Sequence, residues 1–174
     1  KSSKIKNDLL ISLGGYDEKN INETLLNLIT KHLNRLKVKV ILGTATKKTK
    51  KITQYEKKYP KNLQLIHETS DMRKEMSFSS FGICGGGLTS YEFATLKIPF
   101  SIICQNSHQM ITANEWSKKG LAINLGLVNT STSKKVKEFL LKLEKNQIHL
   151  KSGLKDLDGK GTFRISKEIK TLLS

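Results

Sequence analysis

Three consecutive glycines, Gly85 to Gly87, follow an apolar run that ends at Cys84, and Thr89, Ser90 and Glu92 come after them. An apolar strand, a glycine turn and the start of a helix together point backbone N–H groups and the positive end of the helix dipole at an anion. Glycine also lets a ligand lie directly on the backbone, because no Cβ stands in the way. The pattern therefore predicts a phosphate-binding turn, with Thr89 or Ser90 as the helix cap and Glu92 in the first helical turn.

The predicted position of Glu92 raises a question of charge, because a carboxylate beside a bound phosphate is unfavourable. The carboxylate becomes useful if it serves another part of the ligand, such as a ribose diol, as acidic residues do in dinucleotide folds. The alternative is a tight turn followed by an acid that stabilises the helix start, with no ligand at all. The residues alone leave both interpretations open.

Apolar runs of strand length alternate along the chain with segments of helical spacing. The expected strands are residues 8–13, 37–42, 63–66, 81–84, 100–104 and 121–125. The expected helices are residues 21–36, 46–59, 71–76, 89–96, 109–119, 133–143 and 162–173. This alternation predicts an α/β fold, a Rossmann-like parallel sheet of about six strands with helices on both faces. We expect residues 1–7 to be a tail or interdomain linker and residues 8–174 to form one domain.

The expected strand order brings two glycine clusters together. With the order 3-2-1-4-5-6, the sheet changes direction between its first and fourth strands, which is where such sheets bind ligands. Gly14 and Gly15 follow the first strand, and Gly85 to Gly87 follow the fourth. Two turns suited to anions should therefore meet at one crevice, which favours a nucleotide ligand over a purely structural turn.

The sequence narrows the class of nucleotide through motifs that it lacks. A nicotinamide site needs G-x-G-x-x-G and an acid after the second strand, and a P-loop needs G-x-x-x-x-G-K-[ST]; neither is present. A sugar nucleotide fits better, because the amide-rich segment Gln105 to Gln109 follows the fifth strand and could hydrogen-bond sugar hydroxyls. The alternative is a solvent-facing loop with a helix cap. Cys84 and Cys104 end apolar runs and form no C-x-x-C, so we expect buried reduced thiols, no metal site and no cofactor.

The formal net charge of +16 admits a second class of function. The basic tract Lys47 to Lys51, followed by Lys57, Lys58 and Lys61, is typical of either a solvated helix face or a surface for an anionic partner. Only three of the 31 basic residues are arginines, whereas specific nucleic-acid readers use arginine for bidentate contacts. A basic nucleic-acid- or polyanion-binding α/β domain is therefore the alternative, with nucleic acid the less favoured partner.

The apolar runs also bear on location. None reaches the roughly 20 residues of a membrane span, and no signal-peptide pattern is present. We therefore expect no membrane span and a cytoplasmic location.

Residues 82–99, G-I-C-G-G-G-L-T-S-Y-E-F-A-T-L-K-I-P, resemble the C-terminal nucleotide-binding domain of GT-B enzymes. The nearest types are the UDP-sugar hydrolase of pseudaminic acid synthesis (PseG type) and the spore-coat polysaccharide proteins (SpsG type); MurG-type N-acetylglucosamine transferases are more distant. Residues 10–17, L-I-S-L-G-G-Y-D, resemble the first glycine turn of this family, and residues 158–165, D-G-K-G-T-F-R-I, resemble its closing segment. The motifs occur in the family's order and extend through nearly the whole chain.

The resemblance implies a role for each matching residue. The residues implied to bind the diphosphate are Gly14, Gly15, Gly86, Gly87, Leu88, Thr89 and Ser90. Glu92 would bind the ribose, Ile66 and His67 would lie near the uracil, and the sugar contacts would come from Asn106, His108 and Gln109. His108 is a departure from the pattern, because it stands inside a loop where the family has Asn directly before Gln.

The resemblance also implies a function, the binding of a UDP-linked acetamido sugar. The whole protein would be a hydrolase or a glycosyltransferase of surface polysaccharide or nonulosonic acid biosynthesis. GT-B enzymes place catalysis between two Rossmann-like halves, and this chain supplies one of them. In the hydrolase type the general base resembles a His of the N-terminal half, so that half-domain is the expected partner and the catalytic residues are unknown. Alone, the chain is expected to bind the nucleotide sugar but to turn it over poorly or not at all.

Overall fold

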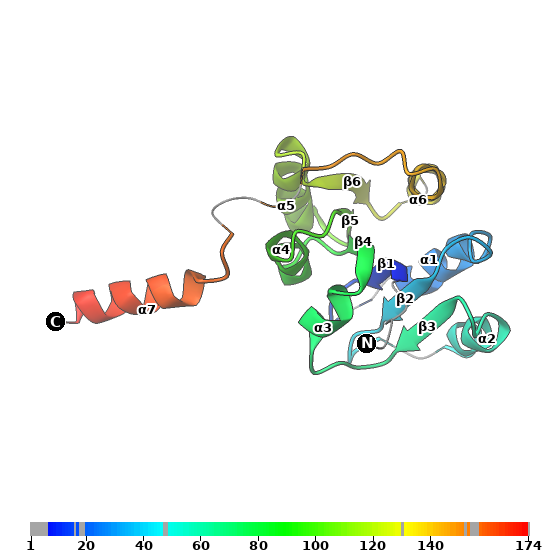
Figure 1. The fold of residues 1–174 in the computed structure, drawn as a ribbon, viewed down its shortest axis with the longest axis horizontal. Coiled ribbons are helices and arrows are strands. Elements are labelled where there is room, and N and C mark those ends of the chain that lie inside the picture. Colours follow the sequence, from blue (N-terminus) through cyan, green and yellow to red (C-terminus); the bar gives the residue numbers. More distant parts are fainter. Residues whose placement is uncertain are drawn as a thin grey trace, which may run out of the picture.

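Six parallel strands form a single sheet in the computed structural model, which describes residues 7–15, 17, 20–46, 49–129, 131–151, 153 and 157–173 (Figure 1). The strands are β1 (Asn7–Ser12), β2 (Val38–Ile41), β3 (Leu63–Ile66), β4 (Ser79–Cys84), β5 (Phe100–Cys104) and β6 (Ala122–Leu127). Their order is β3-β2-β1-β4-β5-β6, and every neighbouring pair is parallel. The predicted fold class and strand order are confirmed.

Seven helices accompany the strands in the described residues. They are α1 (Ile21–Ile29), α2 (Lys50–Lys58), α3 (Met72–Met76), α4 (Leu88–Thr95), α5 (Ser107–Lys118), α6 (Thr132–Glu144) and α7 (Gly161–Leu172). The first six alternate with the strands along the chain. They cover the sheet on both faces, as predicted.

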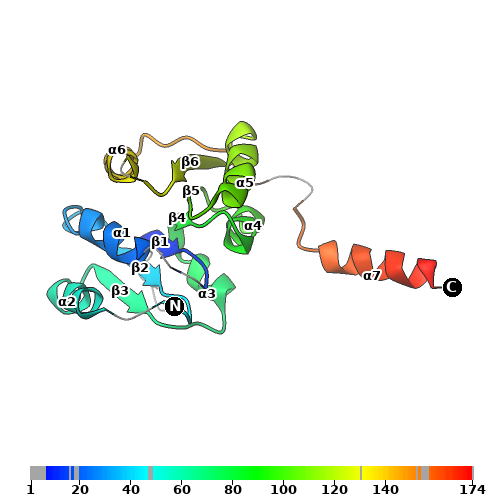
Figure 2. The same cartoon turned by 180° about the vertical axis from the view of Figure 1, so that it is seen from behind.

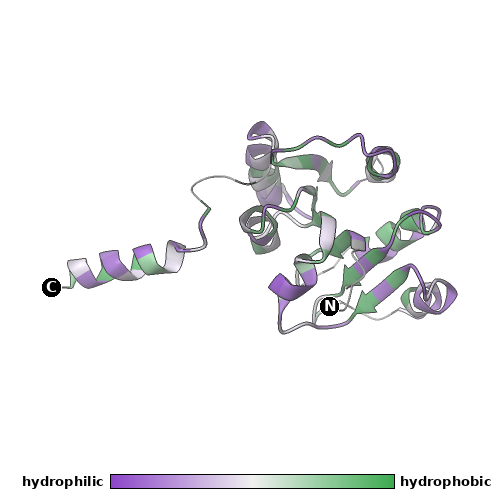
Figure 3. Ribbon diagram, in the orientation of Figure 1, coloured by the Kyte–Doolittle hydropathy of each residue, from purple (hydrophilic) through white to green (hydrophobic). Residues whose placement is uncertain are grey.

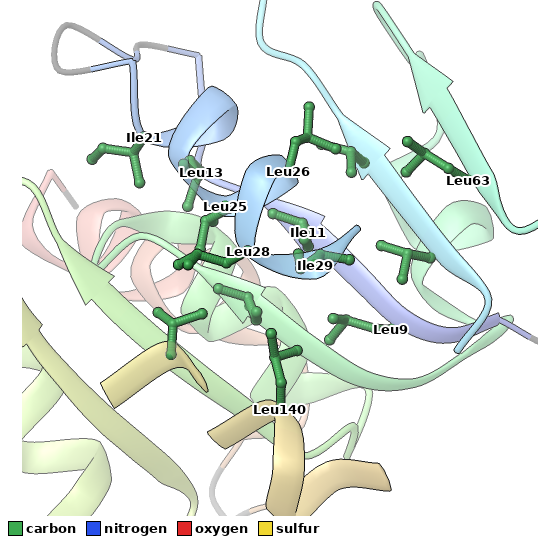
Figure 4. Packing of buried hydrophobic residues seen from close by; sticks show 14 of the residues in the cluster. Leu9, Ile11, Leu13, Ile21, Leu25, Leu26, Leu28, Ile29, Leu63 and Leu140 are labelled. Atoms are coloured by element: carbon green, nitrogen blue, oxygen red, sulfur yellow. The ribbon is translucent and has the colours of Figure 1, made fainter. Parts of the chain in front are cut away.

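The alternation of side chains along β1 divides the core into two halves. Leu9 and Ile11 point to the face that is covered by α1, α2 and α6, whereas Leu10 points to the face of α3, α4 and α5. Figure 4 shows Ile11 beside Ile29 of α1, with Leu140 of α6 on the same face. Apolar residues concentrate on the strands in Figure 3, as expected for a parallel sheet that is buried on both faces.

Several element boundaries differ from the prediction. Residues 1–6 lie outside the described residues, and Asn7, which was expected to close the tail, begins β1 instead. The second helix begins at Lys50 rather than at Thr46, because the Thr49 hydroxyl accepts a hydrogen bond from the Ile52 amide at 3.2 Å and caps it there. The first helix ends at Ile29 rather than at Leu36, and residues 30–35 continue as turns.

The last predicted helix is present as α7, and it projects away from the sheet in both views (Figures 1 and 2). None of its residues is buried, and Phe163, Ile165, Ile169, Leu172 and Leu173 are all exposed. That residues 8–174 act as one domain stays a prediction. Among the described helices, none is long and apolar enough to cross a membrane.

Candidate functional site

Two neighbouring cavities open at the carboxyl ends of β1 and β4. The larger, of about 480 Å³, is lined by Leu13, Gly14, Gly15, Gly85, Gly87, Leu88, Thr89, Gln105, Asn106 and Gln109. The smaller, of about 290 Å³, is lined by Ser12, Gly14, Gly15, Ile41, Leu42, Gly43, Thr44, Glu68, Thr69, Met72, Leu88, Thr89 and Glu92. Gly14, Gly15, Leu88 and Thr89 line both cavities, so the two glycine clusters meet where the strand order predicts.

The N-terminus of α4 is the anion-binding feature of these cavities. Gly87 is the N-cap residue and Leu88 the first helical residue, so neither Thr89 nor Ser90 caps the helix as predicted. Within the described residues, the backbone amides of Gly87, Leu88 and Thr89 donate no hydrogen bond. Free amides at the positive end of a helix dipole are suited to a phosphate.

Ser90 does not offer its side chain to a ligand. It is fully buried, its hydroxyl donates to the Gly87 carbonyl oxygen at 2.7 Å, and Trp116 Nε1 donates to its Oγ at 3.1 Å. The hydroxyl therefore holds α4 against α5, and the role of Ser90 in the diphosphate-binding turn stays a prediction.

Gly86 is also structural. It lines neither cavity, and a Cβ at this position would lie 2.7 Å from the backbone oxygen of Gln109. Its amide donates to Gln109 Oε1 at 3.3 Å. Gly86 is thus required so that the turn can pack on α5, whereas a Cβ at Gly87 would meet nothing within 4 Å and would extend into open space.

The first glycine turn, Gly14 and Gly15, lines both cavities, and its role in binding the diphosphate stays a prediction. Asp17 Oδ1 accepts from the Ile21 amide at 2.6 Å, and its Oδ2 accepts from the Asn22 amide at 3.0 Å and from Asn22 Nδ2 at 2.9 Å. The protein's own carboxylate therefore occupies the start of α1. Gly14 has φ +90, a conformation that a residue with a side chain rarely adopts, so the backbone turns sharply under the cavities.

Glu92 lines the smaller cavity, as its predicted ribose role requires. It lies in the second turn of α4 rather than in the first, one turn after Leu88 and on the same side of the helix. Its carboxylate has no hydrogen bond or ion pair within the part of the chain that the structure describes. The group is an open acceptor at the cavity wall, and its distance from the helix end removes the capping alternative.

The predicted base-side residues lie elsewhere. Ile66 packs against the core cluster under α3, and His67 is exposed; neither lines the two cavities. The far wall of the smaller cavity is made by Gly43 and Thr44 after β2 and by Glu68 and Thr69 after β3. The predicted base-side residues Ile66 and His67 thus directly precede the residues of this wall, and their role stays a prediction.

Of the predicted sugar residues, Asn106 and Gln109 line the larger cavity and His108 does not. Asn106 Oδ1 accepts from the Gln109 amide at 3.1 Å and caps α5, which begins inside the expected loop. Gln109 Oε1 accepts from the Gln105 amide at 2.9 Å as well as from Gly86. Both amide oxygens are therefore used by the fold, and the amide nitrogens are the groups that remain to donate to a ligand.

No family model matches the sequence. The chain is 26% identical over 175 residues to the spore coat polysaccharide biosynthesis protein SpsG of Bacillus subtilis (strain 168). The matched region covers 95% of this chain and 50% of SpsG. The chain thus spans about half the length of this curated relative.

Two solved structures show the same fold. The structure of Acinetobacter baumannii MurG matches with TM-score 0.64 and 21% identity, over 96% of this chain and 54% of MurG. The structure of UDP-GlcNAc 2-epimerase from Neisseria meningitidis, bound to UDP-GlcNAc, matches with TM-score 0.59 and 14% identity, over 96% of this chain and 45% of the epimerase. The chain has the fold of one GT-B half. The predicted resemblance to SpsG-type and MurG-type proteins is confirmed.

The cavities of this GT-B half contain little charge, although the chain carries a net charge of +16. Within the part of the chain that the structure describes, the only ionisable residues in their lining are Glu68 and Glu92. Of the basic tract, Lys47 and Lys48 lie outside the described residues, and Lys51 Nζ lies 3.0 Å from Glu23 Oε1. The hydrogen bond from Lys51 lowers the pKa of Glu23 and raises that of Lys51. Among the described residues, an anion at this site therefore has backbone amides rather than lysines around it.

The cysteines near the site are not nucleophiles. Cys84 ends β4 directly below the glycine turn, and burial raises the pKa of its thiol well above the usual value. Burial likewise raises the pKa of Cys104 to about 11. Both are free and buried, so they are neutral thiols at pH 7. Among the described residues, no three His, Cys, Asp or Glu side chains are grouped to hold a metal ion.

Proposed function

We propose that this GT-B half binds the UDP part of a UDP-sugar in the two cavities at the carboxyl edge of the sheet. The observation that carries the proposal is the pairing of three open amides at the start of α4 with the open carboxylate of Glu92, one turn further along. A nucleoside diphosphate has complementary groups in the same sequence, phosphate oxygens followed by a ribose diol. Leu88 and Thr89 line both cavities and join the two parts.

In this arrangement the diphosphate accepts hydrogen bonds from the amides of Gly87 to Thr89. The ribose donates to Glu92, and the base lies toward Thr44 and Thr69 in the smaller cavity. The sugar extends into the larger cavity, where the amide nitrogens of Asn106 and Gln109 can donate to it. The structure supports this orientation because the ribose acceptor and the amide donors lie in different cavities that share the phosphate turn.

The relatives support UDP-sugars as the ligand class. SpsG is named for spore coat polysaccharide biosynthesis, and the Neisseria meningitidis epimerase was solved with UDP-GlcNAc. We propose by extension that the ligand of this chain is a UDP-linked acetamido sugar, used in making a surface polysaccharide or a nonulosonic acid. We also place the protein in the cytoplasm, where the two buried free thiols stay reduced.

The proposed reaction of the whole protein is transfer of the sugar to an acceptor hydroxyl or to water. As the bond between the anomeric carbon and the β-phosphate oxygen breaks, negative charge grows on the diphosphate. The amides at the start of α4 stabilise that charge, and they do so without reorganising because the helix fixes them. The acceptor and the base that deprotonates it come from the other half of the protein, since the described residues of the cavity lining include no histidine or lysine.

Calorimetric titration of this chain with UDP, CDP, GDP and ADP tests the proposal. We expect one saturable site for UDP, with UDP-GlcNAc bound at least as tightly and uridine bound much more weakly. Weak dependence on salt is expected, because the site uses amides rather than lysines. A steep loss of affinity with salt would instead indicate counterion release on a basic surface and contradict the proposal.

A further inference from the structure

A third cavity, of about 630 Å³, lies at the opposite edge of the sheet, at the amino ends of β2 and β3. The charged residues that line it are four lysines, Lys37, Lys39, Lys61 and Lys74, and two glutamates, Glu56 and Glu75. Four positive charges against two negative leave a net excess of two positive charges. The nucleotide cavities show the opposite balance, with two glutamates and no lysine.

Lys39 is the unusual member of this set. It is 8% exposed on β2, between Val38 and Val40, and its Nζ lies 2.6 Å from Glu75 Oε2. The desolvation cost of burying such an ion pair is about as large as the attraction between its charges, so a gain in folding stability does not explain why the pair is buried. An ammonium has three N–H donors, and in the described part of the chain Glu75 is the one partner of Lys39 Nζ. The remaining donors are available to a ligand in the cavity.

The other lysines come from separate elements that the fold holds in place. Lys61 lies in the loop before β3, which is anchored where Asn62 Nδ2 donates to the Leu33 carbonyl oxygen. Lys74 lies on α3, where its amide donates to Asp71 Oδ1 at 2.9 Å. The side chains of Lys37, Lys61 and Lys74 form no ion pair within the described residues. Lysines from β2, a loop and α3 therefore converge on one cavity without carboxylates to neutralise all of them.

We propose that this cavity binds a compact anion carrying two or more phosphoryl groups. Multiple lysines around a concave space match several phosphoryl charges that lie close together, whereas an extended nucleic-acid backbone needs a stripe of positive charge. Of the described lysines in and after the basic tract, Lys61 lines this cavity. The proposal is independent of nucleotide-sugar binding, since no residue lines both this cavity and those at the carboxyl edge.

Tripolyphosphate is a suitable probe, measured by calorimetry with the chain as it stands. We expect one saturable site, and at least a tenfold loss of affinity in the double variant Lys61→Gln with Lys74→Gln. Both lysines are exposed, so the variant should fold. The matched control is Lys142→Gln with Lys145→Gln on and just after α6, which removes the same charge from exposed positions and should change the affinity less than twofold.

A third variant tests the buried pair, Lys39→Met together with Glu75→Gln. It removes both charges at once and leaves no buried charge without a partner, so it should fold and lose at least tenfold in affinity for tripolyphosphate. Equal losses in the Lys61 and Lys142 double variants would reduce the effect to net charge and overturn the proposal. Tighter binding of a single-stranded oligonucleotide that competes with tripolyphosphate would also overturn it.

Discussion

Glu92 carries the recognition of ribose in the proposed complex. Hydrogen bonds to a charged group contribute about 1.5–3 kcal/mol each, less where water competes. Two partly screened bonds predict a loss of roughly 2–3 kcal/mol in binding for Glu92→Ala, which is about 30- to 150-fold in affinity for UDP. Calorimetry with UDP and 2′-deoxy-UDP measures it: the wild type should prefer UDP, and the variant should bind the two about equally.

Two comparisons make the Glu92 result specific. Glu138→Ala on α6 removes an exposed glutamate elsewhere and should leave UDP affinity unchanged. The melting temperature of Glu92→Ala should stay close to that of the wild type, because Glu92 is beyond the first turn of α4. A wild-type protein that is indifferent to the 2′-hydroxyl would remove Glu92 from the ribose.

The substitution Gly87→Ser, which adds one hydroxyl at the start of α4, should affect folding stability and UDP binding in opposite directions. Its extended backbone, with φ -96 and ψ -154, suits a serine N-cap, and a Cβ there meets nothing within 4 Å. In Gly87→Ser the hydroxyl would accept from amides of the first turn, the groups that we assign to phosphate. We expect the helix to gain a few tenths of a kcal/mol and UDP affinity to fall about tenfold.

Urea unfolding and calorimetry on the same Gly87→Ser sample check both signs. Gly86→Ser is the contrasting variant, since its Cβ would meet the backbone of Gln109 and lower the stability instead. If Gly87→Ser binds UDP as tightly as the wild type, the start of α4 does not hold the diphosphate.

At the scale of the element, α1 and α4 both begin after a glycine turn but differ in what occupies their first amides. Asp17 fills that place at α1, with three hydrogen bonds to Ile21 and Asn22. Asp17→Ala should therefore cost about 1–2 kcal/mol of folding free energy, as the loss of a helix cap does. UDP affinity should change less than threefold, because the ligand uses α4.

Denaturant unfolding and UDP titration of Asp17→Ala distinguish the two helix starts. A clear rise in UDP affinity would place the diphosphate on α1, contrary to the proposed orientation, because removal of the carboxylate frees the Ile21 and Asn22 amides. Gly14 and Gly15, which precede α1, line the same two cavities as the start of α4, so this variant tests which helix receives the anion.

At the scale of the whole molecule, this chain corresponds to half of a longer relative, with its ligand cavities at one edge of the sheet. We predict that the chain alone releases no UDP from UDP-GlcNAc while binding it. The reason is chemical. Among the described residues, the cavity lining offers two carboxylates and no group that can position an acceptor at the anomeric carbon. A coupled assay for free UDP, at protein concentrations that saturate the sugar nucleotide, measures it.

Steady release of UDP by the purified chain would contradict this prediction and would require a base within the described fold. His67→Ala and His108→Ala would then be the first variants to assay, since both imidazoles are exposed at the carboxyl edge. With no turnover in the wild type, the same two variants should bind UDP normally, because neither residue lines a cavity.

The sequence alone determined the strand order and the meeting of the two glycine clusters. Apolar period and glycine turns are local signals, and the rules for parallel sheets convert them into one topology. Glu92 followed from the same signals, because a residue one turn into a helix lies near that helix's start.

The tertiary structure decided which side chains line the two cavities. Ser90 and Gly86 lie in the turn itself, yet both form hydrogen bonds with α5, more than 20 residues away in the chain. Ser90 Oγ accepts from Trp116, and the Gly86 amide donates to Gln109. Thr69 and not Ile66 lines the far wall of the smaller cavity, because Ile66 packs against the core. The lysine cavity depends wholly on packing, since β2, a loop and α3 must converge before their charges can act together. Periodicity determines where a strand or helix lies in the sequence. Which partner each side chain contacts depends on neighbouring elements, and these are brought together only in the folded chain.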